Sequence, residues 1–202
     1  MSERQRAHHR PLAGLIAVAL AAVLAVCAGC STGDDATVYG GSFTFVSPGG
    51  KTELSYPVAE RKPVGTLSGP NLDGTGTVSV ADYPNDVVVL NFWGSWCGPC
   101  RGEADDLNSA ASALKTDGVQ FLGINVKDSQ SAGADFLASK EVGYPSIFDP
   151  TMRTLLSIRG YPATAIPSTI VLDRQHRVAH IWLDTVTADE LTAAIAPIAA
   201  EK

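Results

Sequence analysis

Residues 87–100 read Val-Val-Val-Leu-Asn-Phe-Trp-Gly-Ser-Trp-Cys-Gly-Pro-Cys, and this stretch decides the fold of the chain. Its first seven residues are too continuously apolar for a strand with one solvated face, so they predict a strand in the buried centre of a sheet. Cys97 and Cys100 follow where a helix is expected to begin. The unpaired amides and positive partial charge of a helix N-terminus favour a thiolate over a thiol. The spacing therefore predicts a redox-active dithiol, with Cys97 as the nucleophile and Cys100 as the resolving thiol.

Two other uses of a Cys-x-x-Cys pair remain open. One is half of a zinc site shared with Cys27 and Cys30, but 66 residues separate the two pairs, far more than the roughly 15–20 usual between zinc knuckles. A purely structural disulfide is the other alternative, although so short a loop removes little chain entropy from the unfolded state. We therefore interpret Cys97 and Cys100 as a redox-active pair.

The N-terminus has the pattern of a bacterial export signal. Three arginines among the first ten residues precede an uncharged stretch of 18 residues, Leu12–Gly29. Ala28-Gly29-Cys30 resembles a lipobox, the site where bacterial lipoproteins are lipidated on cysteine and cleaved, so we expect Cys30 to be lipidated. Two or more acyl chains hold a protein stably to a membrane. The stretch is also long enough for an uncleaved membrane anchor, and this alternative stays open.

Either interpretation places the folded part on the extracytoplasmic face of the bacterial cytoplasmic membrane. We expect a leader at 1–29, a polar, Gly-rich tether at 30–42 and one domain at 43–202. Cys97 and Cys100 are the only cysteines beyond residue 30, in a compartment that permits disulfides. The formal net charge is −6 and the leader is basic, so the domain is acidic and nucleic acid is disfavoured as a partner.

The remaining sequence alternates between strand and helix patterns. We expect strands at 87–93, 119–126, 168–172 and 178–182, helices at 99–114, 131–141, 152–159 and 188–199, a hairpin of 43–46 with 54–56, a second hairpin of 168–172 with 178–182, an edge strand at 77–80 and a short extended piece at 147–148. This order predicts an α/β fold with a mixed sheet.

With the dithiol at the first strand–helix junction, this pattern resembles the thioredoxin fold, a three-layer α/β fold in which helices cover both faces of a central mixed sheet. An N-terminal hairpin extension is expected here. More narrowly, the chain resembles the extracytoplasmic TlpA/ResA-type thiol-disulfide oxidoreductases. The residues that carry this resemblance are Val-Leu-Asn-Phe-Trp-Gly-Ser-Trp-Cys-Gly-Pro-Cys-Arg-Gly-Glu at 89–103 and Ile-Pro-Ser-Thr-Ile-Val-Leu-Asp at 166–173. It spans roughly residues 60–200.

The resemblance implies roles for two polar residues near the dithiol. Glu103, one helical turn beyond Cys100, is expected to be partly buried with a raised pKa and to accept the Cys100 proton. A solvated helix glutamate is the alternative. Asn91 stands where cytoplasmic thioredoxins have a buried aspartate, a departure that the TlpA/ResA group commonly shares. A hydrogen-bonding core residue is the alternative for Asn91.

The resemblance also implies a substrate-binding surface around the dithiol. It consists of Trp96, Gly98, Pro99, Ile166 and Pro167, with Trp96 forming an apolar docking surface around an exposed Cys97 sulfur. Pro167 is expected to be cis, because the family's proline is, with the backbone of Ile166 pairing with the bound chain. From sequence alone a trans proline is the default.

The function implied is that of a protein-disulfide oxidoreductase. The Gly98-Pro99 dipeptide favours a reductant, and the resemblance suggests apocytochrome c as its disulfide-bonded client in cytochrome c maturation. Electrons are expected from a membrane thiol transporter of the CcdA type, with no organic cofactor and no metal. Two alternatives stay open: a Dsb-type disulfide oxidase or isomerase for exported proteins, and a non-catalytic lipoprotein that uses the fold as a binding module.

Overall fold

A computed structural model of the chain describes residues 41–201, which lie within one compact unit. The expected leader, the lipidation residue Cys30 and all but the last two residues of the expected tether lie outside the described residues. Among residues 41–201, none of the helices combines the length and apolar character that a membrane crossing requires.

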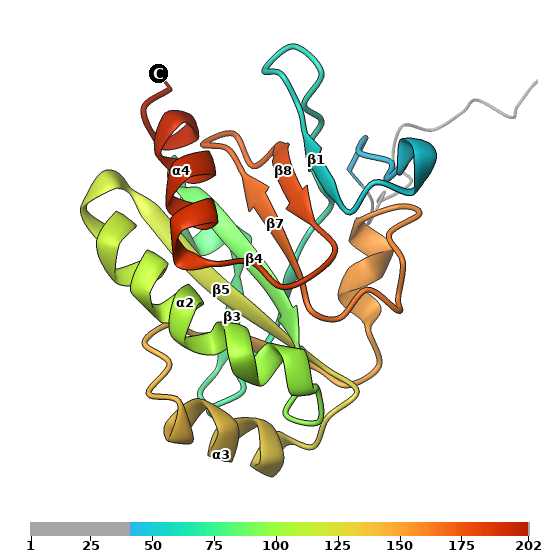
Figure 1. The fold of residues 1–202 in the computed structure, drawn as a ribbon. Coiled ribbons are helices and arrows are strands. Elements are labelled where there is room, and N and C mark those ends of the chain that lie inside the picture. The colour runs from blue at the N-terminus through green and yellow to red at the C-terminus, as the bar shows by residue number, and fades with distance from the viewer. Residues whose placement is uncertain (1–40, 202) are drawn as a thin grey trace, which may run out of the picture. The chain divides into compact units, whose positions relative to one another are not determined.

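A six-stranded mixed sheet forms the centre of the domain (Figure 1). Its strands, in the spatial order β1-β8-β7-β4-β5-β6, are β1 (Glu53–Ser55), β8 (Val178–Trp182), β7 (Ser168–Leu172), β4 (Val87–Trp93), β5 (Val119–Val126) and β6 (Ser146–Asp149). The central strand β4 pairs in parallel with β5 and antiparallel with β7, and every one of its residues is buried. The predicted central position of this strand is confirmed, as is the predicted β7–β8 hairpin.

One face of the sheet is covered by two α-helices, α2 (Gly98–Leu114) and α4 (Ala188–Ala199) (Figure 1). Alternate residues of β4 and β5 point to this face and pack against Leu107, Leu114, Leu191 and Ile195 of the helices. A capping box of Thr187 and Glu190 begins α4. The third helix, α3 (Gln130–Ser139), lies near the start of α2, where its Phe136 packs against Trp93 with ring centroids 4.9 Å apart.

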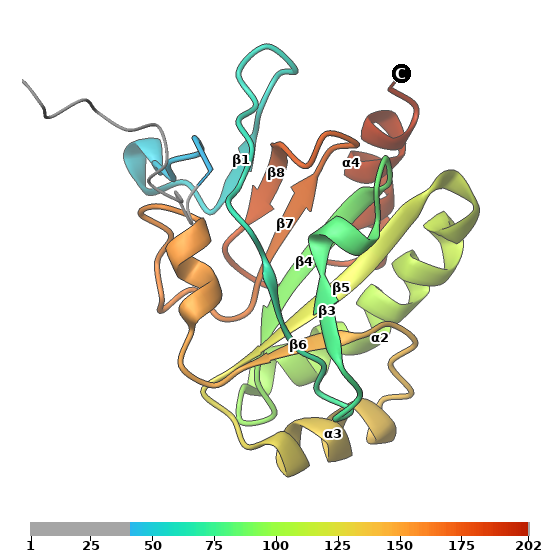
Figure 2. The ribbon, with the colours of Figure 1, turned by 180° about the vertical axis from the view of Figure 1, so that it is seen from behind.

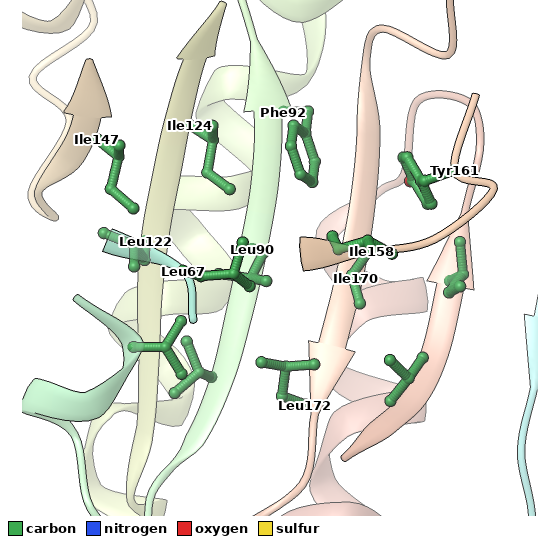
Figure 3. Packing of buried hydrophobic residues seen from close by; sticks show 14 of the residues in the cluster. Leu67, Leu90, Phe92, Leu122, Ile124, Ile147, Ile158, Tyr161, Ile170 and Leu172 are labelled. Atoms are coloured by element: carbon green, nitrogen blue, oxygen red, sulfur yellow. The ribbon is translucent and has the colours of Figure 1, made fainter. Parts of the chain in front are cut away.

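The opposite face has a different cover (Figure 2). It consists of the 3-10 helix η4 (Arg153–Ser157) and a separate hairpin of β2 (Ser68–Pro70) and β3 (Thr77–Ser79). The other 3-10 turns of the described residues are η1 (Pro48–Gly50), η2 (Val80–Asp82), which follows β3, and η3 (Lys115–Asp117), which continues α2. Figure 3 shows the second core on this side, where Leu90 and Phe92 of β4 and Leu122 and Ile124 of β5 point the same way, toward Leu67, Ile158 and Tyr161. The thioredoxin-like α/β fold is therefore confirmed, with the helical cover of this face reduced to η4.

The expected hairpin of 43–46 with 54–56 is wrong. Residues 53–55 form β1, which pairs antiparallel with β8 at the edge of the large sheet. Thr44 instead forms an isolated bridge with Arg159, and the residues between fold into η1. An isolated two-stranded hairpin is marginally stable, whereas joining a six-stranded sheet supplies both a hydrogen-bonded ladder and a core on which Leu54 packs. The N-terminal hairpin of the domain is β2–β3 instead.

Candidate active site

The two cysteines lie at the junction of β4 and α2, as the sequence predicts, and are joined in a disulfide with their Cα atoms 5.3 Å apart. Cys97 is the N-cap of α2, and the backbone N–H of Cys100 donates to the Cys97 sulfur over 3.2 Å. In the reduced protein this donor, together with the positive end of the helix, stabilises negative charge on Cys97. The local geometry therefore favours Cys97 as the thiolate of the pair.

The Cys97 sulfur is not the exposed atom that we expected. Only 3% of Cys97 is accessible, because it packs in a small cluster with Trp93 and Phe136, against which Ile166 also rests. The exposed apolar group is Trp96 itself, 51% accessible. A partner must therefore approach the disulfide through the rim formed by Trp96 and the exposed turn at 98–99.

Glu103 is buried, with 3% of its surface accessible, so the solvated alternative is wrong. Its carboxylate accepts hydrogen bonds from Asn91 Nδ2 at 3.0 Å and from the backbone N–H of Val186 at 3.3 Å. Burial raises the pKa of Glu103 from 4.5 to about 7, although these two hydrogen bonds oppose the rise. Asp184 and Asp106 raise the pKa further by charge repulsion. This carboxyl group therefore changes its charge close to neutral pH, where a proton acceptor works best.

Asn91 of β4 holds the Glu103 side chain in place. Its buried side chain donates from Nδ2 to Glu103 and to Thr169 Oγ1, the latter over 3.2 Å. It also lines, together with Cys100, a cavity of about 10 Å³, about the room that one water needs. Asn91 therefore hydrogen-bonds Glu103 and borders, together with Cys100, the same small cavity.

The peptide bond between Ile166 and Pro167 is cis, as the resemblance implies. The segment before it is joined to the β5–α3 turn by Lys127, whose ammonium group donates to the carbonyl of Ala163 over 3.4 Å. Because Ile166 also packs on the dithiol cluster, the fold brings the residues of both resemblance motifs together at one end of the sheet.

Sequence reasoning missed Asp128, which holds the turn before the dithiol. Its carboxylate accepts from the backbone N–H of Ser95 at 2.6 Å and from the Ser95 hydroxyl at 2.8 Å. The indole of the next residue, Trp96, donates to the carbonyl of Val126 over 3.0 Å. The indole also lies over Gly94, where a Cβ would come within 2.3 Å of the indole nitrogen. Only the glycine before the motif signals this arrangement in the sequence, because Ser95 and Asp128 belong to different elements.

Residues 61–181 match the AhpC/TSA family. The chain is 30% identical over 110 residues to the thiol-disulfide oxidoreductase ResA of Bacillus subtilis, covering 54% of this chain and 60% of that protein. It is 32% identical over 115 residues to the thiol:disulfide interchange protein HelX of Rhodobacter capsulatus, covering 56% of this chain and 61% of that protein. The chain thus spans about 60% of the length of these curated relatives.

Two solved structures resemble the domain over nearly their whole length. A secreted thiol-disulfide isomerase from Corynebacterium glutamicum is 41% identical with a TM-score of 0.78, covering 80% of this chain and 100% of that one. A DsbF homologue from Corynebacterium diphtheriae is 46% identical with a TM-score of 0.73, covering 77% of this chain and 98% of that one. ResA and HelX are thus relatives that the chain resembles over part of their length, and the chain belongs to the AhpC/TSA family.

Proposed function

We propose that this protein is a thiol-disulfide oxidoreductase that acts on disulfides of other proteins outside the cytoplasmic membrane. The observation that carries the proposal is the Cys97–Cys100 pair at the N-terminus of α2, with the Cys100 N–H directed at the Cys97 sulfur. A buried carboxyl group that titrates near neutral pH, one helical turn away, supports it. Relatives named for thiol-disulfide exchange and for secretion support both the chemistry and the location.

In the reducing direction, the Cys97 thiolate attacks one sulfur of a partner disulfide, and the partner's other sulfur leaves as a thiolate. The Cys100 thiol then gives its proton to the Glu103 carboxylate, and its thiolate attacks the Cys97 sulfur. The partner's second sulfur leaves, so two electrons have passed to the partner and the Cys97–Cys100 disulfide has formed. Trp96, Gly98, Pro99, Ile166 and Pro167 form the surface on which we expect the partner chain to lie.

The physiological direction that we propose is reduction. The Gly98-Pro99 dipeptide favours it, and the ResA-type motifs suggest a role in cytochrome c maturation with apocytochrome c as the client. A membrane thiol transporter of the CcdA type would restore the reduced dithiol. Lipidation at Cys30 would hold the domain at the membrane, with an uncleaved N-terminal anchor as the alternative.

A second candidate is a Dsb-type oxidase or isomerase for exported proteins. It is favoured by the two solved structures, which are named a secreted thiol-disulfide isomerase and a DsbF homologue. Their sequence identities to this chain exceed those of ResA and HelX. Both candidates use the same residues, so they differ in the stability of the Cys97–Cys100 disulfide rather than in the site.

The reduction potential of the Cys97–Cys100 couple separates the two candidates, measured by equilibration with glutathione buffers. A reduction potential of about −270 mV supports the reductant, and one of about −120 mV supports the oxidase. An insulin-reduction assay tests the shared chemistry, with the Cys97→Ser/Cys100→Ser double variant as the inactive control. If the wild-type protein reduces insulin no faster than this control, the chain is a non-catalytic binding module and the proposal fails.

A further inference from the structure

The first turn of α2 carries a charge pattern opposite to the one that stabilises a helix. Acidic side chains are favoured where a helix begins, and cations where it ends. α4 follows this rule, because Asp189 and Glu190 occupy its first turn. α2 has no acidic residue in its first turn, and its fourth residue is Arg101. A cation at this place does not stabilise the helix, but it favours negative charge on the residue where the helix begins, which is Cys97.

The Arg101 side chain is held close to the dithiol by two contacts. Its guanidinium group donates from Nη2 to the carbonyl of Ser95 over 2.8 Å, so the side chain turns back toward the segment before Cys97. The guanidinium carbon also lies over the ring of Phe136, 6.0 Å from the ring centroid, which is within reach of a cation–π contact. Phe136 packs in the same apolar cluster as Cys97. The cation is therefore fixed beside the turn that carries the nucleophile, although its side chain is exposed.

A carboxylate binds the same turn from the other side. Asp128 accepts from the N–H and the hydroxyl of Ser95, whose carbonyl accepts from Arg101. The negative charge that holds this turn also disfavours a thiolate two residues later, and the guanidinium group offsets it. The other ionisable groups on the elements around the dithiol are Glu103 of α2, Lys127 of the β5–α3 turn, Asp135 of α3 and Asp73, which follows Leu72 of the cluster.

We propose that Arg101 is a positioning residue that supplies the positive charge stabilising the Cys97 thiolate of the reduced protein. The proposal rests on the proposed function and concerns how strongly the dithiol reduces its partner. A stabilised thiolate makes the reduced form more stable, so the charge raises the reduction potential of the Cys97–Cys100 couple. Arg101 acts through its charge and exchanges no proton, because a guanidinium group stays protonated in proteins.

The test is a titration of the Cys97 thiol in the reduced full chain, followed by NMR of isotope-labelled cysteine and assigned with Cys97→Ser. Arg101→Met keeps an unbranched side chain over Phe136 but removes the charge. The pKa of Cys97 should then rise by about 0.3–0.7 pH unit, the effect of an exposed charge at a helix terminus. Arg101→Lys keeps the charge and should titrate close to wild type. Arg101→Gln is a second neutral variant should Arg101→Met not fold.

Lys115→Met is the matched control. Lys115 is exposed at the other end of α2, where it is the C-cap, so this variant has the same net charge as Arg101→Met. At a rise of 1.5 Å per residue the two positions lie about 21 Å apart along the helix. That is about twice the Debye length in 0.1 M salt, so the charge of Lys115 is screened from Cys97. The Cys97 titration in Lys115→Met should therefore match wild type.

Ionic strength separates the charge of Arg101 from its hydrogen bond to Ser95, since Arg101→Met loses both. The Debye length falls from about 10 Å in 0.1 M salt to about 3 Å in 1 M salt, so the pKa difference between wild type and Arg101→Met should shrink in 1 M salt. A difference caused only by a disturbed turn would persist. The inference is overturned if the neutral variants titrate like wild type, if Arg101→Lys or Lys115→Met shifts as far as they do, or if the difference is the same at both salt concentrations.

A second measurement connects the charge to the redox equilibrium. At a pH above the Cys97 pKa of both proteins, equilibration with glutathione should show Arg101→Met shifted about two- to fivefold toward the disulfide, because its thiolate has lost the stabilising charge. An unchanged or opposite equilibrium would overturn the effect on the reduction potential. Because the thiol titration needs no partner protein, it decides the role of Arg101 even if the insulin assay refutes the proposed function.

Discussion

Replacing the buried carboxyl group of Glu103 by a neutral amide should change how the stability of the oxidised domain depends on pH. The pKa of Glu103 in the folded chain is about 7, whereas the ordinary pKa of a glutamate is 4.5. Between these two values the folded state holds a proton that the unfolded state has released, so the stability from neutral Glu103 is complete below 4.5 and is lost as the pH rises through about 7. A tenfold change in an ionisation constant is worth about 1.4 kcal/mol, so ionised Glu103 lowers the free energy of unfolding by about 3 kcal/mol.

The assay is urea denaturation of the oxidised protein at several pH values, for the wild type and for Glu103→Gln. The stability of Glu103→Gln relative to wild type should increase by about 3 kcal/mol between pH 4.5 and about pH 8, because glutamine carries no charge at either end. Glu60→Gln, at an exposed position, is the control and should show no such trend. A stability difference between Glu103→Gln and wild type that is constant over this range would refute the reasoning.

Three further predictions concern the support of the site and the fold. Asp128→Asn removes the charge that holds the turn before the dithiol, so urea denaturation should show a loss of about 1–2 kcal/mol and the insulin-reduction rate should fall. Arg61→Ala removes an ion pair with Asp173, which is 1% accessible, and should cost about 2 kcal/mol in the same denaturation assay. Gly102→Ala adds a methyl group on α2 that meets nothing within 4 Å and should stabilise by about 0.5–1 kcal/mol, whereas Gly123→Ala places a Cβ 2.1 Å from a serine oxygen of β6 and should destabilise by about 1–3 kcal/mol. Thermal unfolding compares these two glycine variants, and a lower melting temperature for Gly102→Ala would contradict the first.

The sequence predicts the parts of this site that lie within one continuous segment. The apolar run of β4 and the cysteines after it define the strand, the turn and the start of α2 without any tertiary information. The β7–β8 hairpin is predicted for the same reason, because its two strands are joined by a short polar turn. Local pattern and global fold agree in these segments, which is the usual condition for a correct prediction from sequence.

The errors arise where the partner of a segment is distant in the chain. Residues 53–55 have the pattern of a hairpin strand, yet β8, more than a hundred residues later, provides the better edge. The burial of Cys97 depends on Phe136 of α3, and the role of Asp128 depends on its meeting with Ser95. No periodicity within one segment contains these contacts, so they become visible only in the folded chain.

The contact between Asn91 and Glu103 gives a physical reason for the asparagine in this chain. Its amide nitrogen lies 3.0 Å from a carboxylate oxygen of Glu103, so an aspartate at the same place, as in cytoplasmic thioredoxins, would put two carboxylates in contact within a buried site. Like charges at that distance cannot both ionise near neutral pH, and the pair would share one proton and titrate in two coupled steps. Asparagine donates a hydrogen bond instead, which lowers the pKa of Glu103 against the effect of burial and keeps it near 7. The buried carboxyl group of the site thus lies on α2, one helical turn after Cys100, and Asn91 serves as its hydrogen-bond donor.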